Sequence, residues 1–274
     1  MSLVRYTVIA IIAGAALSPG GQKDTTAAGG ALVAKMEAAY KTLDALHIKV
    51  KSSARYSGGM SAADMPPPGP DTLELRMQRP NKLFVSAASR RHGEQSSYLV
   101  VSDGVTLSYW RSWTNSFVQT KAPAVLAGIA RQLPDDAIGT FADHTWEDQS
   151  ILEWDLLADD RTPSITKELG ASGGGLTTTG PEKQGGALVY VVLRTTPPAP
   201  GVLPFTIEQR YFLDAESYLL RGEATSARGK HPENGRDFTV EMRAQYELFS
   251  TQPTFSDADF RFVAPRGARP DKGR

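Results

Sequence analysis

The chain has 274 residues, 30 basic and 30 acidic side chains, a formal net charge of zero and no cysteine. Without a net positive charge or a polybasic run, nothing favours a nucleic-acid or anionic-lipid partner. The lack of cysteine excludes disulfides, thiolate nucleophiles and cysteine metal sites, and the length suits one mostly β domain.

The first residues are typical of a secretory signal. Arg5 precedes a short apolar run, residues 6–17, that is below the roughly 20 residues of a spanning helix. Residues 1–18 are therefore predicted to be a signal peptide, with an uncleaved anchor as the alternative. Localisation is then periplasmic or otherwise extracytoplasmic, without a lipid anchor because no cysteine follows. Residues 19–30, small and polar, are expected to form a flexible tether.

A helix and a strand follow the tether. Apolar residues recur at helical spacing between Leu32 and Leu43, which predicts an amphipathic helix lying on a sheet. Residues 46–56 then alternate, with Leu46, Ile48 and Val50 on one face, as in a half-buried strand. Residues 58–70 contain three consecutive prolines and are predicted to be a loop.

The next segment reads as a meander of short antiparallel strands. Pro80-Asn81 and Asp103-Gly104 are turn signals between alternating runs. The predicted strands are residues 73–79, 83–88, 98–101, 105–111 and 117–120.

Arg79 is the least expected residue of this meander. Leu73, Leu75 and Met77 share the apolar face of their strand, and Arg79 would continue that face. A guanidinium group on an apolar surface is costly unless its hydrogen bonds are accepted. Either the strand ends there and Arg79 turns into water, or the charge is held inside for a purpose.

The pattern changes between residues 123 and 160, where helical spacing returns. Residues 125–133, 138–141 and 151–157 are predicted to form three short helices that pack on the sheet, and Pro163 would end the last. Residues 170–186, rich in Gly and Thr, suit a mobile loop or an irregular hairpin.

A second β block completes the chain. Residues 188–193 are almost wholly apolar, which predicts a strand covered on both faces. Residues 230–235 are a polar turn, and residues 269–274 are expected to be a disordered tail. The remaining predicted strands are residues 203–214, 218–226, 238–248 and 260–263.

These elements predict an α+β fold in one domain, residues 31–268. About 10–11 antiparallel strands, each apolar on one face, should curl into an incomplete half-barrel with helices covering its concave face. Imperfect packing between the helices and the concave sheet would leave an apolar cavity.

Three motifs occur in order along this domain: Arg79-Pro80-Asn81, the run from Leu99 to Leu107, and the run from Phe260 to Gly267. In that order and strand context the chain resembles the periplasmic outer-membrane lipoprotein carriers and their lipoprotein-sorting relatives, the LolA-like family. The resemblance runs from about Leu32 to Ala268. It implies a half-barrel with a helical lid.

The resemblance also implies a function: a non-catalytic carrier or binder of lipid or lipidated cargo, with lipoprotein acyl chains in the cavity. Arg79 would act as a latch that bonds carbonyl groups within residues 123–157 and keeps the empty lid shut. The implied partners are membrane-bound donor and acceptor proteins, with no cofactor and a monomeric chain. The implied ligand-binding residues are Arg79, Leu73, Leu75, Met77, Val85, Val125, Leu126, Ile129, Leu156, Leu157, Phe205, Ile207, Val240 and Met242.

Two other classes of function remain. An envelope sensor or interaction module could use the same fold to bind a protein or polymer, with a filled core and a solvated Arg79. For an enzyme, the sequence shows no set of nucleophile, base and orienting group, and its four histidines have no metal-ligand spacing. We therefore expect neither catalysis nor a metal site.

Overall fold

The computed structural model describes residues 23–59, 61, 71–91, 94–132, 176–184, 186–198, 205–231 and 234–271. The predicted signal peptide, most of the proline-rich loop and the predicted helices after residue 132 lie outside these ranges, so those predictions remain untested.

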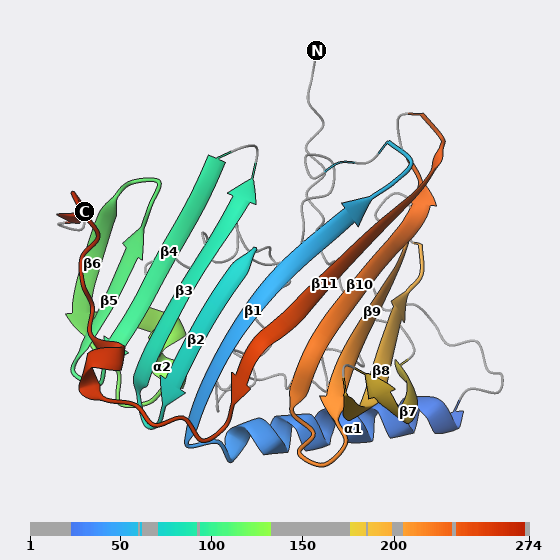
Figure 1. Cartoon of the computed structure of the whole chain (residues 1–274), viewed down its shortest axis with the longest axis horizontal. Helices are drawn as coiled ribbons and strands as arrows, with labels where there is room; N and C mark the ends of the chain where they lie inside the picture. The colour runs from blue at the N-terminus through green and yellow to red at the C-terminus, as the bar shows by residue number, and fades with distance from the viewer. Residues whose placement is uncertain are drawn as a thin grey trace.

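A single open sheet of twelve strands dominates the described part of the chain (Figure 1). All neighbours are antiparallel except the parallel pair β12–β6. The central pair joins β1 to β11, the first strand to the last long one, and its flanks are the β2–β6 meander and the β10–β7 meander. The strands are β1 (Ala45–Tyr56), β2 (Thr72–Gln78), β3 (Lys82–Arg91), β4 (Glu94–Asp103), β5 (Thr106–Arg111), β6 (Ser116–Lys121), β7 (Leu176–Gln184), β8 (Ala187–Thr196), β9 (Phe205–Asp214), β10 (Leu220–Lys230), β11 (Asp237–Ser250) and β12 (Arg269–Pro270).

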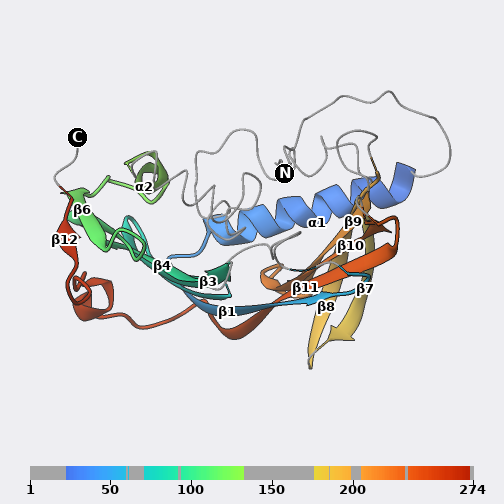
Figure 2. The ribbon, with the colours of Figure 1, turned by 90° about the horizontal axis from the view of Figure 1, so that it is seen from above.

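The sheet curls, as the sequence predicts, and the described helices cover only part of its concave face (Figure 2). Helix α1 (Lys23–Lys41) lies on that face and contacts β7 and β8. The much shorter α2 (Ala127–Gln132) lies near the other end of the sheet. A full helical cover is thus not evident in the described ranges.

Helix α1 corrects the predicted tether, because it begins at Lys23 and runs through residues 23–30. Gly29 explains how this glycine-containing stretch becomes a packed helix. A Cβ atom on Gly29 would lie 2.9 Å from Leu176 Cβ on β7, so the missing side chain allows α1 to approach the sheet closely. Tertiary packing here outweighs the poor helix propensity of glycine.

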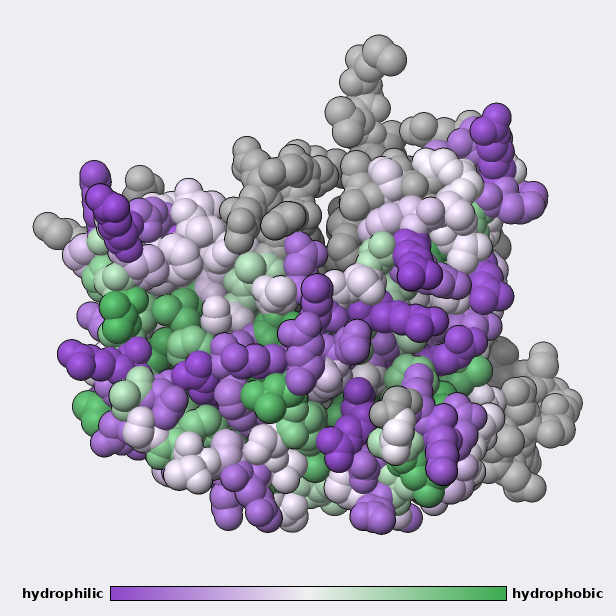
Figure 3. All heavy atoms as spheres, viewed as in Figure 1, coloured by the Kyte–Doolittle hydropathy of each residue, from purple (hydrophilic) through white to green (hydrophobic). Residues whose placement is uncertain are grey.

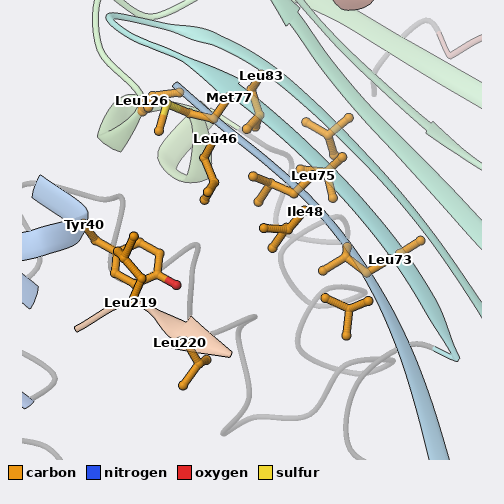
Figure 4. Packing of buried hydrophobic residues seen from close by; sticks show 14 of the residues in the cluster. Tyr40, Leu46, Ile48, Leu73, Leu75, Met77, Leu83, Leu126, Leu219 and Leu220 are labelled. Atoms are coloured by element: carbon orange, nitrogen blue, oxygen red, sulfur yellow. The ribbon is translucent and has the colours of Figure 1, made fainter. Parts of the chain in front are cut away.

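The concave face carries the hydrophobic core in two groups. The main cluster combines Val33, Met36 and Tyr40 of α1 with inward-facing residues of the strands, such as Leu46 and Leu75 (Figure 4). The distal cluster consists of Ala227, Phe238, Val240 and Met242, with partly buried residues of β1 and β9 packed against it. Alternation along the strands puts both clusters on one face, and therefore in one layer.

The opposite, convex face carries many hydrophilic side chains, together with hydrophobic patches on its left side in Figure 3. The C-terminal segment, residues 251–271, ends alongside β6, and its 3-10 helix η1 (Asp257–Phe260) contacts β3 and β4. Phe260 is fully buried, with its ring 5.1 Å from that of Phe255. The predicted strand at residues 260–263 is therefore wrong: Asp259 Oδ2 accepts hydrogen bonds from the backbone and hydroxyl of Ser256, which favours a tight turn.

The structure confirms one further prediction, the irregular hairpin, and corrects two others, the covered strand at residues 188–193 and the tail at residues 269–274. The Gly- and Thr-rich segment forms the irregular hairpin β7–β8, with a register shift between Thr179 and Glu182, which brings the strand count above the predicted range. Leu188 is 47% exposed, so β8 is not covered on both faces along its length. The predicted tail contributes the edge strand β12, held by the Arg111–Asp271 ion pair at 3.0 Å.

Candidate functional site: the concave face and the Arg79–Asn81 turn

Strand β2 supplies apolar side chains to the concave face as predicted. Leu73, Leu75 and Met77 are all buried and belong to the main cluster. Leu75 lies between Ile48 of β1 and Val85 of β3 in the sheet register. The structure therefore brings four of the predicted ligand-binding residues together on one surface.

Arg79 follows directly after the last residue of β2. Its half-buried side chain donates a hydrogen bond from Nε to the Leu43 carbonyl oxygen at 2.9 Å, just beyond the end of α1. Its backbone N–H bonds the Asp44 carbonyl at 2.8 Å. The strand ends, yet the guanidinium group does not simply turn into water. The acceptor of Nε precedes β1, and the bonding of Arg79 to carbonyl groups within residues 123–157 stays a prediction, because most of that segment lies outside the described residues.

The next two residues tie other parts of the molecule to the same turn. The Pro80 carbonyl accepts a bond from the Leu126 backbone N–H at 2.9 Å, beside the start of α2. Asn81 Nδ2 donates to the carbonyl oxygens of Gly104, at 3.0 Å, and Pro123, at 2.7 Å. The Arg79–Asn81 turn therefore connects the end of α1, the start of α2 and the β4–β5 hairpin.

The predicted residues of the 123–157 segment separate into three groups. Leu126 and Ile129 are buried in the main cluster. Val125 is 51% exposed, so it is not an inward-facing residue beside α2. Leu156 and Leu157 lie outside the described residues.

The last four predicted residues lie at the distal cluster. Val240 and Met242 are buried, and the half-buried Phe205 and Ile207 pack against them. The rings of Phe205 and Phe238 meet edge to face at 5.6 Å. The predicted site thus covers both clusters of one concave surface, not one compact pocket.

A row of polar side chains between the two clusters escaped the sequence analysis. In register across β8, β9 and β10, Arg194 faces Gln209, Gln209 faces Thr225, and Tyr211 faces Glu223. We call these five residues the polar band. The alternation of residues 205–213 puts Gln209 on the same face as Ile207 and Tyr211, but its polar neighbours on β8 and β10 follow only from the strand register.

Contacts within the polar band are close. Arg194 Nη1 donates to Gln209 Oε1 at 3.2 Å, and the guanidinium group also bonds the Tyr211 side chain. No described residue donates a hydrogen bond to the Glu223 carboxyl group. Burial raises the pKa of Glu223 to about 7. Burial, followed by the Glu223 charge, raises the pKa of Tyr211.

The convex face holds a contrasting charged group around Glu74. Burial raises the pKa of Glu74, but hydrogen bonds from Arg76 and His47 and the charges of Arg76 and Lys49 outweigh it and lower that pKa. The bonding atoms lie 2.8–2.9 Å from Glu74 Oε1. Since these contacts join β1 to β2, and Arg76 also bonds Asp259 of η1, we regard this group as structural.

Within the described ranges, no three or more His, Asp or Glu side chains gather in an arrangement that could hold a metal ion. Among the described helices, none combines the length and the apolar character needed to cross a bilayer.

No protein-family model matches the chain, and no curated protein matches its sequence. Solved structures show weak similarity. Lipoprotein LppX of Mycobacterium tuberculosis is 13% identical, with a TM-score of 0.39 over 84% of this chain and 98% of that one. LprF of Mycobacterium bovis is 9% identical, with a TM-score of 0.42 over 84% and 96%. The Pseudomonas aeruginosa MucA/MucB complex structure contains a chain that is 13% identical, with a TM-score of 0.34 over 86% and 62%. Similarity at this level carries no argument about this chain.

Proposed function

We propose that this protein is an exported, non-catalytic carrier or binder of lipid or lipidated cargo, held against the concave face of the sheet. The observation that carries the proposal is the apolar character of that face along most of the strands. Each methylene group moved from water onto such a surface contributes about 0.8 kcal/mol, so a long acyl chain would gain on the order of 10 kcal/mol.

In this proposal the Arg79–Asn81 turn is the latch. It bonds the end of α1 and the start of α2, so it could hold both helices against the sheet when no ligand is bound. Charge-assisted hydrogen bonds of this kind are strong enough to bias an open–closed equilibrium by a few kcal/mol. The further residues of the site are the buried members of the two clusters named above.

Lipid binding is tested directly by native mass spectrometry of the purified mature chain, followed by lipid extraction. We expect a co-purifying amphiphile, released by organic solvent. A lipid-free chain that also fails to take up a pyrene-labelled acyl lipid from phosphatidylcholine vesicles contradicts the proposal.

Arg79→Leu tests the latch. This variant keeps apolar bulk but removes the bond to Leu43 that stabilises the empty, closed state. The loaded protein should therefore release a pyrene-labelled lipid about tenfold more slowly, without unfolding. Arg55→Leu is the matched control, because Arg55 lies exposed on β1. Equal release rates for the two variants would leave lipid binding intact but remove the latch.

A further inference from the structure

The polar band interrupts an otherwise apolar surface at one level of the sheet. Along β9, Phe205 and Ile207 pack with the distal cluster, Gln209 follows, and Tyr211 and Leu213 belong to the main cluster. Strand β10 has the same order. Ala227 belongs to the distal cluster, Thr225 and Glu223 belong to the polar band, and Leu220 belongs to the main cluster. The cross-strand register aligns these changes, so the band is continuous across three strands.

The band is rich in hydrogen-bond donors. Arg194 can only donate, the Gln209 amide and the hydroxyl groups of Tyr211 and Thr225 can donate as well, and Glu223 supplies the one carboxyl group. Arg194, Gln209, Thr225 and Glu223 keep part of their surface exposed. A polar group that settles here would therefore be recognised through its acceptor oxygens.

We propose that the polar band binds the polar linkage of the lipid, and that the ligand is an amphiphile with an ester-type acceptor between two apolar arms. This inference rests on the proposed function. One arm would cover the distal cluster and the other the main cluster. Phe205 and Leu213 each lie four positions along β9 from Gln209, so each arm has about 13 Å of surface.

The charges of the polar band favour a ligand with an uncharged acceptor group over a ligand with a cationic headgroup. Arg194 is always positive, and it lies beside Tyr211, which in turn faces Glu223. A carboxyl group with a pKa of about 7 carries only part of its charge at neutral pH, so it does not make the band negative. A cationic ligand would be repelled by the charge of the guanidinium group.

The test compares a pyrene-labelled diacylglycerol with its diether analogue, which lacks the ester carbonyl oxygens, in transfer from phosphatidylcholine vesicles. We expect the native mature chain to prefer the diester by about tenfold. Arg194→Met should reduce that preference to within about twofold while the affinity for the diether stays unchanged. Arg210→Met is the matched control, since Arg210 lies one strand away on the convex face and pairs there with Glu208.

Gln209→Leu, with the exposed Gln245→Leu as its control, provides a second variant should Arg194→Met fail to fold, as judged by thermal unfolding. An unchanged diester preference in the folded band variants overturns the inference. A native chain that binds both lipids equally overturns it too and leaves the proposed function standing, whereas a chain that binds neither contradicts both.

Discussion

The pKa values of three carboxyl groups in this sheet shift in different directions, according to the hydrogen bonds that each group accepts. Glu74 and Asp214 lose exposure, yet hydrogen bonds from neighbours outweigh the cost of burial and lower the pKa of each group. Glu223 receives no such bond from a described residue, so burial dominates and raises its pKa. A group of this kind favours its neutral form in the folded protein and is a source of pH dependence.

The stability of the protein should therefore fall as Glu223 ionises. Because its pKa is raised from 4.5 to about 7 by burial, its stabilising contribution is complete below the pKa of the unfolded chain and is lost as pH rises through 7. The exposed part of the side chain limits the loss to about 1–2 kcal/mol. Urea unfolding of the native chain and of Glu223→Gln between pH 5 and pH 8 measures it. A difference between the two proteins that is constant with pH would contradict the prediction.

At the scale of elements, alternation and turn chemistry made most strands predictable. Pro80-Asn81 and Asp103-Gly104 mark their turns correctly, and Asp103 Oδ1 accepts two backbone N–H groups, those of Val105 and Thr106, to close the hairpin. The helical character of residues 23–30 was not predictable, because it depends on contact with β7, which is distant in sequence. The acceptor of Arg79 and the polar band were hidden for the same reason: both require knowing which elements are neighbours.

Two adjacent glycines of α1 provide a test of that contact. A Cβ atom on Gly30 would have no neighbouring atom within 4 Å, so Gly30→Ala should stabilise the protein by about 0.5–1 kcal/mol through helix propensity. Gly29→Ala gains the same propensity but forces α1 away from Leu176, and we expect a net loss of about 1 kcal/mol. Denaturant unfolding of both variants measures the difference, and equal effects would show that α1 does not need its close approach.

At the scale of the whole molecule, the C-terminal segment links the β11 end of the chain to the β2–β6 meander. Lys82 Nζ contacts Asp257 Oδ1 at 2.7 Å and lies 5.9 Å from the centre of the Phe260 ring, while Arg76 reaches the Asp259 carbonyl at 3.3 Å. These contacts fasten the C-terminal segment to the convex face, opposite the concave face on which we propose that the ligand binds.

Truncation of the buried ring in this segment should be costly. We expect Phe260→Ala to destabilise the protein by about 3–5 kcal/mol, because its side chain is fully buried. Val263→Ala, at a position 69% exposed, should change stability by less than about 0.5 kcal/mol. Thermal and denaturant unfolding compare the two, and a small effect of Phe260→Ala would mean that the segment is not part of the cooperative unit.

The open sheet ends in two edges with different protection against self-association. Strand β12 adds only two residues to β6, and its Pro270 has no N–H to offer a further strand. On β7, Pro181 and the register shift before Glu182 interrupt the row of backbone groups, and Lys183 adds charge. Each edge thus discourages the addition of another strand, which limits self-association through backbone pairing.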